Sequence, residues 1–253
     1  MGVLQGKVAI ITGAGQGVGA GIARAFAAEG AMLMLSGRTK EKVDRIADAL
    51  SEGGATVHAM QCDVTVPGDL AAMVEETVAR FGGIDLLINN AQTVTTNVNL
   101  IDMAEQDFTD MFDSGPLAAF RLMRLCHPHL KVRGGAVVNF ATAAAVRWDM
   151  AGYGPYAGVK ECIRSLTRAA ATEWGPDNIR VNTIAPMAMS EAFRDWMAAD
   201  PETTDAFVAQ IPAGRVGDPE RDIGRAVVFL CGPDAAYLNG ATIPLDGGYA
   251  NFG

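Results

Sequence analysis

The chain has 253 residues, 49% of them hydrophobic and 19% charged, which is typical of a folded globular protein rather than a disordered or fibrous one. Its formal net charge of −9 argues against nucleic acid and anionic membrane surfaces as main partners, because both attract basic surfaces. The sequence has no apolar run of membrane-spanning length and no signal-peptide architecture at its amino terminus, so we expect a cytoplasmic protein.

The four cysteines are widely spaced and show neither metal-ligand nor redox-pair spacing, so buried, reduced thiols are expected. His127 and His129 flank a proline near a predicted helix end. With no third ligand nearby in the sequence, they fit surface or capping residues better than a metal pair. We therefore expect no bound metal.

The predicted elements alternate between strand and helix along the chain. Apolar runs predict seven strands, at residues 8–11, 31–35, 55–60, 84–88, 136–140, 179–184 and 241–245. Helical apolar spacing predicts helices at residues 18–28, 41–50, 67–81, 105–130 and 155–174. Apolar strands separated by helices indicate a parallel sheet covered on both faces. With no linker or repeat, residues 1–253 are predicted to form one doubly wound α/β domain of the Rossmann type.

The segment after Pro186 breaks this regularity. Its large apolar side chains are Met187, Met189, Phe193, Trp196 and Met197. Open α/β sheets bind ligands at the carboxyl ends of their strands. The favoured interpretation of residues 187–212 is therefore a mobile apolar flap over a substrate pocket, and the alternative is a small helix packed on the core.

A glycine-rich segment follows the first strand and opens the first helix. Glycine permits positive φ and a close approach of backbone to phosphate, and a helix amino terminus offers free N–H groups and a positive dipole end. In this position the segment predicts a dinucleotide loop. The expected pyrophosphate-binding residues are Gly13, Gly15, Gln16, Gly17, Val18 and Gly19.

The end of the second strand bears on the choice of cofactor. NAD sites usually carry an acidic residue there, which binds the ribose 2′-hydroxyl. Here the segment 35–38 has no acid and ends in Arg38, whose guanidinium can hold a 2′-phosphate. The sequence therefore favours NADP over NAD, with a solvated surface arginine as the alternative.

Several short motifs occur in a characteristic order along the whole chain. They are the glycine loop, Cys62-Asp63-Val64, Asn89-Asn90-Ala91, Tyr156-Ala157-Gly158-Val159-Lys160, Arg180-Val181-Asn182 and Asp246-Gly247-Gly248. In these the chain resembles the short-chain dehydrogenase/reductase family. The resemblance implies the strand order 3-2-1-4-5-6-7, a nicotinamide cofactor and usually a homotetramer.

The resemblance also implies roles for individual residues. Tyr156 matches the catalytic acid/base, and Lys160 matches its partner, which also holds the nicotinamide ribose. The two are four residues apart and share one helix face. A lysine ammonium and a positive nicotinamide ring would both favour the phenolate and bring the pKa of Tyr156 nearer neutrality. The remaining cofactor contacts implied are Asp63 and Val64 on the adenine side, with Asn90, Ala91 and Pro186 lining the cleft.

The chain departs from the family pattern around the reacting groups. The catalytic serine position falls on Thr142, one residue farther from the tyrosine than usual, while Ala143 occupies the usual spacing. A threonine hydroxyl can still orient a carbonyl oxygen. Trp148 is most simply a packing residue, although it follows the fifth strand closely enough to reach the pocket.

A second group of departures concerns the proton relay and the pocket. Gly115 aligns with the helix asparagine that normally holds a relay water. Because Pro116 has no N–H, we expect an unpaired carbonyl at Phe112 that holds the water instead, and Asp113 or Ser114 could also contribute. Gln92 and Met187 replace usual glycines, so a reshaped substrate pocket is expected.

The leading functional prediction is the interconversion of a secondary alcohol and a ketone on an apolar small molecule. Tyr156 moves the proton, Thr142 steadies the oxygen and Lys160 tunes the tyrosine. One alternative is an enoyl or dienoyl thioester reductase, because Tyr153 has the spacing to Lys160 used by such enzymes. The other is a nicotinamide-binding sensor without catalysis.

Overall fold

The computed structural model describes residues 2–147 and 149–250. Its centre is a seven-stranded sheet in the order β3-β2-β1-β4-β5-β6-β7, with every neighbouring pair parallel. The strands are β1 (Val8–Thr12), β2 (Met32–Gly37), β3 (Val57–Gln61), β4 (Leu86–Asn89), β5 (Gly135–Phe140), β6 (Ile179–Pro186) and β7 (Thr242–Leu245). The predicted strands and their predicted order are confirmed.

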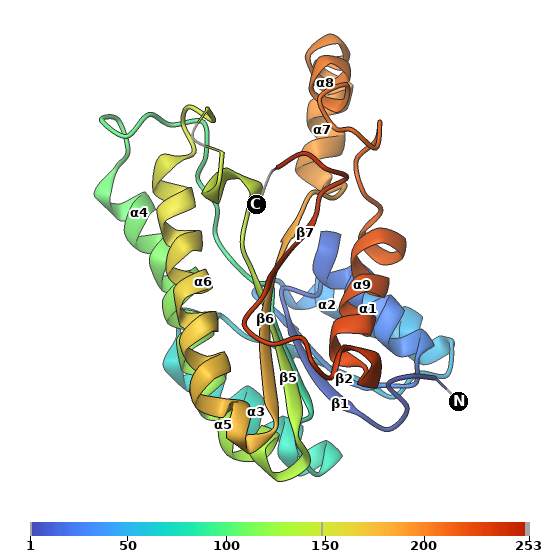
Figure 1. Cartoon of the computed structure of the whole chain (residues 1–253). Coiled ribbons are helices and arrows are strands. Elements are labelled where there is room, and N and C mark those ends of the chain that lie inside the picture. The colour runs from blue at the N-terminus through green and yellow to red at the C-terminus, as the bar shows by residue number, and fades with distance from the viewer. Residues whose placement is uncertain (1, 148, 251–253) are drawn as a thin grey trace.

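Helices cover both faces of the sheet, so the doubly wound fold is confirmed (Figure 1). The helices are α1 (Gly17–Ala28), α2 (Lys40–Glu52), α3 (Pro67–Phe81), α4 (Glu105–Phe112), α5 (Ala118–Arg133), α6 (Gly154–Trp174), α7 (Glu191–Ala199), α8 (Pro201–Val208) and α9 (Arg225–Cys231). Helices α1, α2 and α9 pack on one face, and α3, α5 and α6 on the other. The inner strands are largely apolar because they are buried from both sides, whereas the edge strands β3 and β7 are only partly buried.

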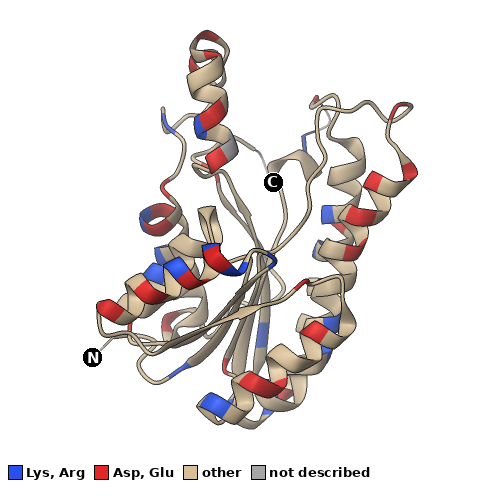
Figure 2. Cartoon of the chain, turned by 180° about the vertical axis from the view of Figure 1, so that it is seen from behind, with Lys and Arg blue, Asp and Glu red and all other residues tan. Residues whose placement is uncertain are grey.

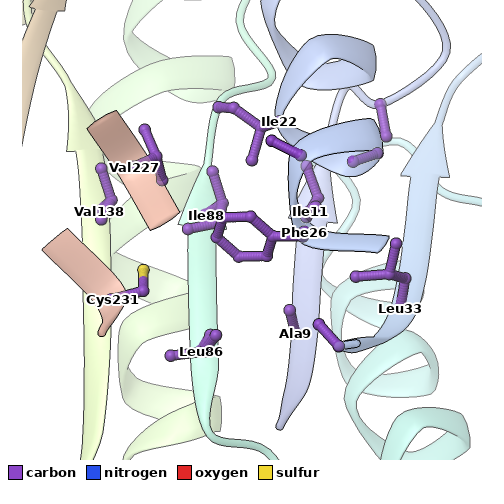
Figure 3. Packing of buried hydrophobic residues seen from close by; sticks show 14 of the residues in the cluster. Ala9, Ile11, Ile22, Phe26, Leu33, Leu86, Ile88, Val138, Val227 and Cys231 are labelled. Atoms are coloured by element: carbon purple, nitrogen blue, oxygen red, sulfur yellow. The ribbon is translucent and has the colours of Figure 1, made fainter. Parts of the chain in front are cut away.

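Successive strand residues contribute to two separate core layers. Ile10 packs with α3 and α5, whereas its neighbour Ile11 packs with α1 and α9. On the second of these faces, Phe26 of α1 lies over the sheet between Ile88 of β4 and Ile11 (Figure 3). Burying a side chain of this size stabilises the fold by about 1.5–3 kcal/mol.

The carboxyl ends of all strands meet at one edge of the sheet. Strands β1 and β4 are neighbours there, although their following helices cover opposite faces. This is the topological switch point at which open α/β sheets bind ligands. The fold therefore places the end of β1 beside the end of β4.

The helix predicted at residues 105–130 is continuous to Arg133 but contains a π turn at Asp113–Leu117 around Pro116. A π turn pairs each carbonyl with the N–H five residues on, as the Ala118 N–H does with Asp113. The same spacing sets the N–H of Leu117, rather than the missing N–H of Pro116, opposite the Phe112 carbonyl. The expectation of an unpaired carbonyl at Phe112 is therefore wrong, because the helix widens to accommodate the proline.

Helices α7 and α8 form an excursion beyond the carboxyl edge of the sheet (Figure 1). The chain leaves and returns at one point, where Ala188 forms an isolated parallel bridge with Gly217. The Met189 N–H donates to the Gly217 carbonyl at 2.9 Å, and the Gly217 N–H donates to the Met187 carbonyl at 3.1 Å. No described residue of α7 is buried. The excursion is thus fixed at its base and lightly packed above it.

Candidate active site

A cleft of about 460 Å³ opens at the carboxyl ends of β1, β2, β3 and β4. Of the predicted cofactor residues it brings together Gly13, Gly15, Gln16, Gly17, Val18, Arg38, Asp63, Val64, Asn90 and Ala91. The lining does not include Gly19, Pro186, Tyr156 or Lys160. The cleft has the place and shape expected for a dinucleotide.

The glycine loop forms a backbone cradle in this cleft. Gly13 and Gly17 have φ values of +65° and +53°, which side chains rarely adopt. A Cβ on Gly19 would lie 2.4 Å from the Gly13 carbonyl oxygen, so Gly19 serves the close packing of α1 on the loop. The side chain of Gln16 makes no capping hydrogen bond, which leaves the first N–H groups of α1 available to an anion. The residues present therefore fit a pyrophosphate.

Hydrogen bonds between Asn90, directly after β4, and Thr12, the last residue of β1, hold the glycine loop in place. The Asn90 side chain donates to the carbonyls of Thr12 at 2.8 Å and Gly13 at 3.1 Å. The Thr12 hydroxyl accepts the backbone N–H groups of Asn90 and Ala91, both at 3.0 Å. The sequence analysis missed Thr12, although its position directly before the first glycine was a signal.

The turn after β3 forms another wall of the cleft. Oδ1 of Asp63 accepts the N–H and the hydroxyl of Thr65, at 2.9 and 2.8 Å. The Asp63 N–H in turn donates to Asp69 at 2.9 Å. These bonds present Asp63 and Val64 to the cleft in a fixed turn.

Two cations line the end of the cleft near β2. Arg38 is exposed, and within residues 2–147 and 149–250 no carboxylate forms an ion pair with its guanidinium. Lys42 of α2, which the sequence analysis missed, hydrogen bonds the Gln16 side chain and lies 3.1 Å from Glu191 at the start of α7. The wall of the cleft is therefore connected to the excursion.

A second connection joins the glycine-loop helix to the base of the excursion. A Cβ on Gly21 of α1 would lie 2.4 Å from the backbone of Pro219, two residues after the bridge at Gly217. The absence of a side chain at this point lets α1 and the returning chain touch backbone to backbone.

The predicted catalytic residues meet at the carboxyl end of β5. Lys160 is buried, its Nζ donates to the Phe140 carbonyl at 2.9 Å, and this nitrogen lies 5.7 Å from the centre of the Tyr156 ring. The Thr142 side chain hydrogen bonds the Tyr156 phenol. Ala143 has no polar side chain, so Thr142 supplies the hydroxyl of this turn that interacts with Tyr156.

The pKa values of these groups differ from the expectation. Burial raises the pKa of Tyr156 to about 12, with the Thr142 hydrogen bond lowering it and the nearby Tyr153 raising it to a smaller extent. Burial also lowers the pKa of Lys160 to about 7. The side chains alone therefore do not bring the pKa of Tyr156 toward neutrality, because desolvation outweighs the Thr142 hydrogen bond.

The substrate side of the site is apolar. Aromatic rings from the excursion and the chain end form a connected group with centroid distances of 5.3 to 5.8 Å, made of Phe193, Trp196, Phe207 and Tyr249. Tyr249 packs in one cluster with Ala143, the residue after Thr142, and Met187 packs against the same cluster. Trp148 lies outside the described residues.

Other potentially reactive side chains lie away from this site. His127 Nε2 is 3.0 Å from Asp177 on the surface, and the described residues contain no group of three or more side chains able to hold a metal. Cys62, Cys126 and Cys231 are buried, and all four cysteines are free. No helix in the described ranges is long and apolar enough to cross a membrane.

A glycine cradle at the switch point, with a half-buried tyrosine and a buried lysine beside it, defines a nicotinamide-dependent oxidoreductase. A family model described as Enoyl-(Acyl carrier protein) reductase matches residues 13–250. The chain is 43% identical to a 12alpha-hydroxysteroid dehydrogenase of Clostridium sp., over 98% of each chain. It is 34% identical to a 3-oxoacyl-[acyl-carrier-protein] reductase of Vibrio cholerae, over 97% of this chain and 98% of the other. The chain belongs to the short-chain dehydrogenase/reductase family.

A solved structure supports the same assignment. The 7 alpha-hydroxysteroid dehydrogenase complexed with NADH and 7-oxo glycochenodeoxycholic acid superposes with a TM-score of 0.91 at 32% identity, covering 98% of this chain and 95% of that chain. The present protein is an enzyme that uses a nicotinamide cofactor to interconvert a secondary alcohol and a ketone.

Proposed function

We propose that the enzyme is an NADP-dependent hydroxysteroid dehydrogenase. The observation that carries the proposal is the aromatic group of the excursion, which extends through Phe207 and Tyr249 to the turn that holds Thr142. A large, rigid, apolar substrate suits such a surface, because its burial is driven by the hydrophobic effect and by ring contacts. The 43% identity to a 12alpha-hydroxysteroid dehydrogenase supports the same substrate class.

In this proposal α7 and α8 act as the flap expected at residues 187–212. The bridge between Ala188 and Gly217 holds the base, and the lightly packed helices above it close over the substrate. Exclusion of water around the reacting oxygen strengthens the polar contacts there.

Three side chains handle the reacting hydroxyl. The Thr142 hydroxyl orients the substrate oxygen and Tyr156 takes its proton, while the bound cofactor supplies the hydride chemistry. In the reverse direction Tyr156 returns the proton to the oxygen. A charged Lys160 and the positive ring of the oxidised cofactor both favour the phenolate, which opposes the effect of burial on the tyrosine.

The cofactor contacts follow from the cleft. The loop from Gly13 to Val18 holds the pyrophosphate, the Asp63 turn and Val64 hold the adenine side, and Asn90 and Ala91 form the floor. We assign the nicotinamide end to Pro186 and Lys160. Arg38 and Lys42 supply two positive charges for a 2′-phosphate, which is the basis for preferring NADP.

We also propose a homotetramer in the cytoplasm. Three phenylalanines are partly exposed on the continuous helix formed by α4, the π turn and α5. They are Phe108 (42%), Phe112 (38%) and Phe120 (39%), and a subunit contact would bury them. The free cysteines are consistent with a reducing compartment.

The substrate assignment is tested by turnover with three compounds and NADP. Deoxycholic acid carries a hydroxyl at carbon 12, chenodeoxycholic acid carries one at carbon 7, and a 3-hydroxyacyl thioester represents the fatty-acid reductases. We expect steroid oxidation with a kcat/KM at least about tenfold above that of the thioester, a difference of about 1.4 kcal/mol. Preference for the thioester would overturn the steroid assignment, and no turnover with any ketone or alcohol would favour the sensor.

The catalytic assignment is tested by two matched variants. Tyr156→Phe is expected to keep cofactor affinity and to lower kcat by about a hundredfold or more, the usual scale for a lost acid/base. Tyr153→Phe removes the phenol of a tyrosine that lies near Tyr156, and it is expected to lower kcat only slightly. If the two effects are reversed, the enoyl-reductase alternative gains.

A further inference from the structure

Arg147 lies at the end of the short turn that begins with Thr142. The turn contains a 3-10 helix at Ala143–Ala145, and the Arg147 N–H donates to the Ala143 carbonyl at 3.2 Å. Because such a helix rises only about 2 Å per residue, the Cα atoms of Thr142 and Arg147 lie within about 10 Å of each other. The turn therefore brings a cation close to the hydroxyl that hydrogen bonds Tyr156.

The guanidinium of Arg147 is stacked on the aromatic group of the substrate side. Its central carbon lies 4.4 Å from the centre of the Tyr249 ring, and that ring lies 5.3 Å from the ring of Phe207 in α8. Within residues 2–147 and 149–250, Arg147 is the only cation stacked on a ring of this group. The surface proposed for the apolar body of the substrate thus carries a positive charge beside Tyr249.

The guanidinium keeps donors for a ligand. Its Nε and Nη2 donate to the Asp149 carboxylate at 3.1 and 2.7 Å, and its Nη1 donates to the Tyr249 carbonyl at 3.4 Å. A guanidinium has five N–H groups. In the part of the chain that the structure describes, one N–H on Nη1 and one on Nη2 therefore have no acceptor. The Arg147 side chain is 22% exposed, so part of it can be reached from solvent.

The ion pair with Asp149 is a replaceable contact. Asp149 follows Arg147 by two residues, and its side chain is 55% exposed. An exposed ion pair stabilises a protein little, because water and salt screen the attraction. A carboxylate that is attached to an apolar body gains the burial of that body as well, so it can take the place of Asp149 on the guanidinium.

We propose that Arg147 is a specificity-determining residue that binds a carboxylate at the end of the substrate's side chain. The steroid body lies on the aromatic group, its hydroxyl meets Thr142 and Tyr156, and its carboxylate accepts hydrogen bonds from Nη1 and Nη2 of Arg147. The side chain of a steroid is attached to ring D, which is nearer to carbon 12 than to carbon 3. The short distance between Thr142 and Arg147 therefore favours a hydroxyl at carbon 12. The inference rests on the proposed hydroxysteroid dehydrogenase function.

Deoxycholic acid and its methyl ester provide the test, because they share the 12-hydroxyl and differ in the charge of the side chain. For the wild type we expect kcat/KM to be about tenfold or more higher for the acid, mainly through KM. Arg147→Gln is expected to raise KM for the acid to that of the ester and to leave kcat unchanged. Added salt should reduce the preference of the wild type, since it screens the charge of the guanidinium.

Asp149→Asn is expected to act in the opposite direction. It removes the competing carboxylate, so KM for the acid should fall by about threefold while KM for the ester stays the same. Arg80→Gln and Glu76→Gln are the matched controls, because they remove the partners of another exposed ion pair, 2.7 Å long, on α3. The controls should keep the wild-type values for both compounds. A preference for the acid that neither Arg147→Gln nor Asp149→Asn changes would overturn the proposal.

The same measurements separate this inference from a structural role of Arg147 and from the proposed function. If Arg147→Gln raises KM for acid and ester equally and lowers the unfolding temperature, Arg147 only holds the segment at Tyr249 and the inference is wrong. If the wild type oxidises the two compounds equally well, the hydroxysteroid assignment stands and the carboxylate site is wrong. If it oxidises neither, the proposed function is overturned and the inference with it.

Discussion

Lys160 lies in an environment that disfavours its own charge. Its Nζ has one neutral carbonyl partner, and burial lowers its pKa from 10.5 to about 7. The motif made Lys160 and Tyr156 recognisable from the sequence, but the pKa values depend on burial, which the motif does not contain. Gln92 and Gly115 were recognised only as separate departures, because their contact joins a loop to a helix more than twenty residues away.

The pKa of Lys160 predicts a pH dependence of stability. Between about pH 7 and 10 the unfolded chain binds a proton that the folded chain does not, so the free energy of unfolding should rise with pH. Lys160→Met should remove this slope, an effect of up to a few kcal/mol. Denaturant unfolding of both cofactor-free proteins at about pH 7 and 9 measures the change in the free energy of unfolding. Both pH values lie below the range in which the raised pKa of Tyr156 would lower the free energy of unfolding. Equal slopes in the two proteins would contradict the assigned pKa.

Arg38 and Lys42 lead to a prediction about cofactor preference. Arg38→Asp replaces a phosphate partner with a ribose acceptor, so NADPH affinity should fall by about tenfold or more while NADH affinity is kept or improved. Lys42→Ala should weaken NADPH binding to a smaller extent, since Lys42 is shared with Glu191. Dissociation constants from fluorescence titration measure both effects, and an unchanged NADPH/NADH ratio in Arg38→Asp would rule out NADP specificity through this residue.

At the scale of the elements, the alternation of strand and helix could be predicted because the buried parallel strands are largely apolar. The π turn could not be predicted from the sequence. Pro116 shows that a helical hydrogen bond is missing, but it does not show whether the helix breaks or widens. The excursion was recognised from its composition. Its division into α7 and α8, with Ser190 and Asp200 as amino-terminal caps, follows from capping residues that the apolar pattern does not include.

Because the excursion is lightly packed, a substitution in it is expected to change substrate affinity without changing the stability of the protein. Trp196→Ala removes a ring that contacts Phe193 and Phe207 but is not part of the core, so KM for a steroid should rise by about tenfold. The unfolding temperature should change by no more than about 2 °C, as for other substitutions outside the core. Phe229→Ala, an exposed aromatic on α9, is the control for KM. A large loss of stability with unchanged KM would mean that Trp196 is structural.

At the scale of the whole molecule, the sheet order followed from the family resemblance, while the surface could not be read from the sequence in detail. Lys and Arg positions are interspersed with Asp and Glu positions along the helices (Figure 2). The exposed phenylalanines of α4 and α5 form a different kind of surface, and apolar spacing alone does not tell which side of an amphipathic helix stays uncovered.

This surface predicts how the assembly can be broken. Phe120→Glu places a charge in the proposed contact, so the particle mass measured by light scattering should fall from that of a tetramer to that of a dimer or monomer. Phe229→Glu changes an aromatic that is 48% exposed, against 39% for Phe120, on the opposite face of the sheet, and it should leave the mass unchanged. A tetramer that survives Phe120→Glu would place the subunit contact elsewhere.

The backbone contact between Gly21 and Pro219 has a consequence for kinetics. In the proposed binding mode helix α1 receives the pyrophosphate at its amino terminus. The same helix touches the chain where the excursion returns, and the Lys42–Glu191 ion pair connects the cleft to the other end of the excursion. If the cofactor binds as proposed, its contacts would fix both ends of the excursion before the proposed steroid substrate is enclosed. We expect a compulsory order, with the nicotinamide nucleotide entering first and leaving last. In calorimetry, a steroid should bind measurably only when the nucleotide is already bound. In steady-state kinetics, the reduced nucleotide should inhibit competitively against the oxidised nucleotide.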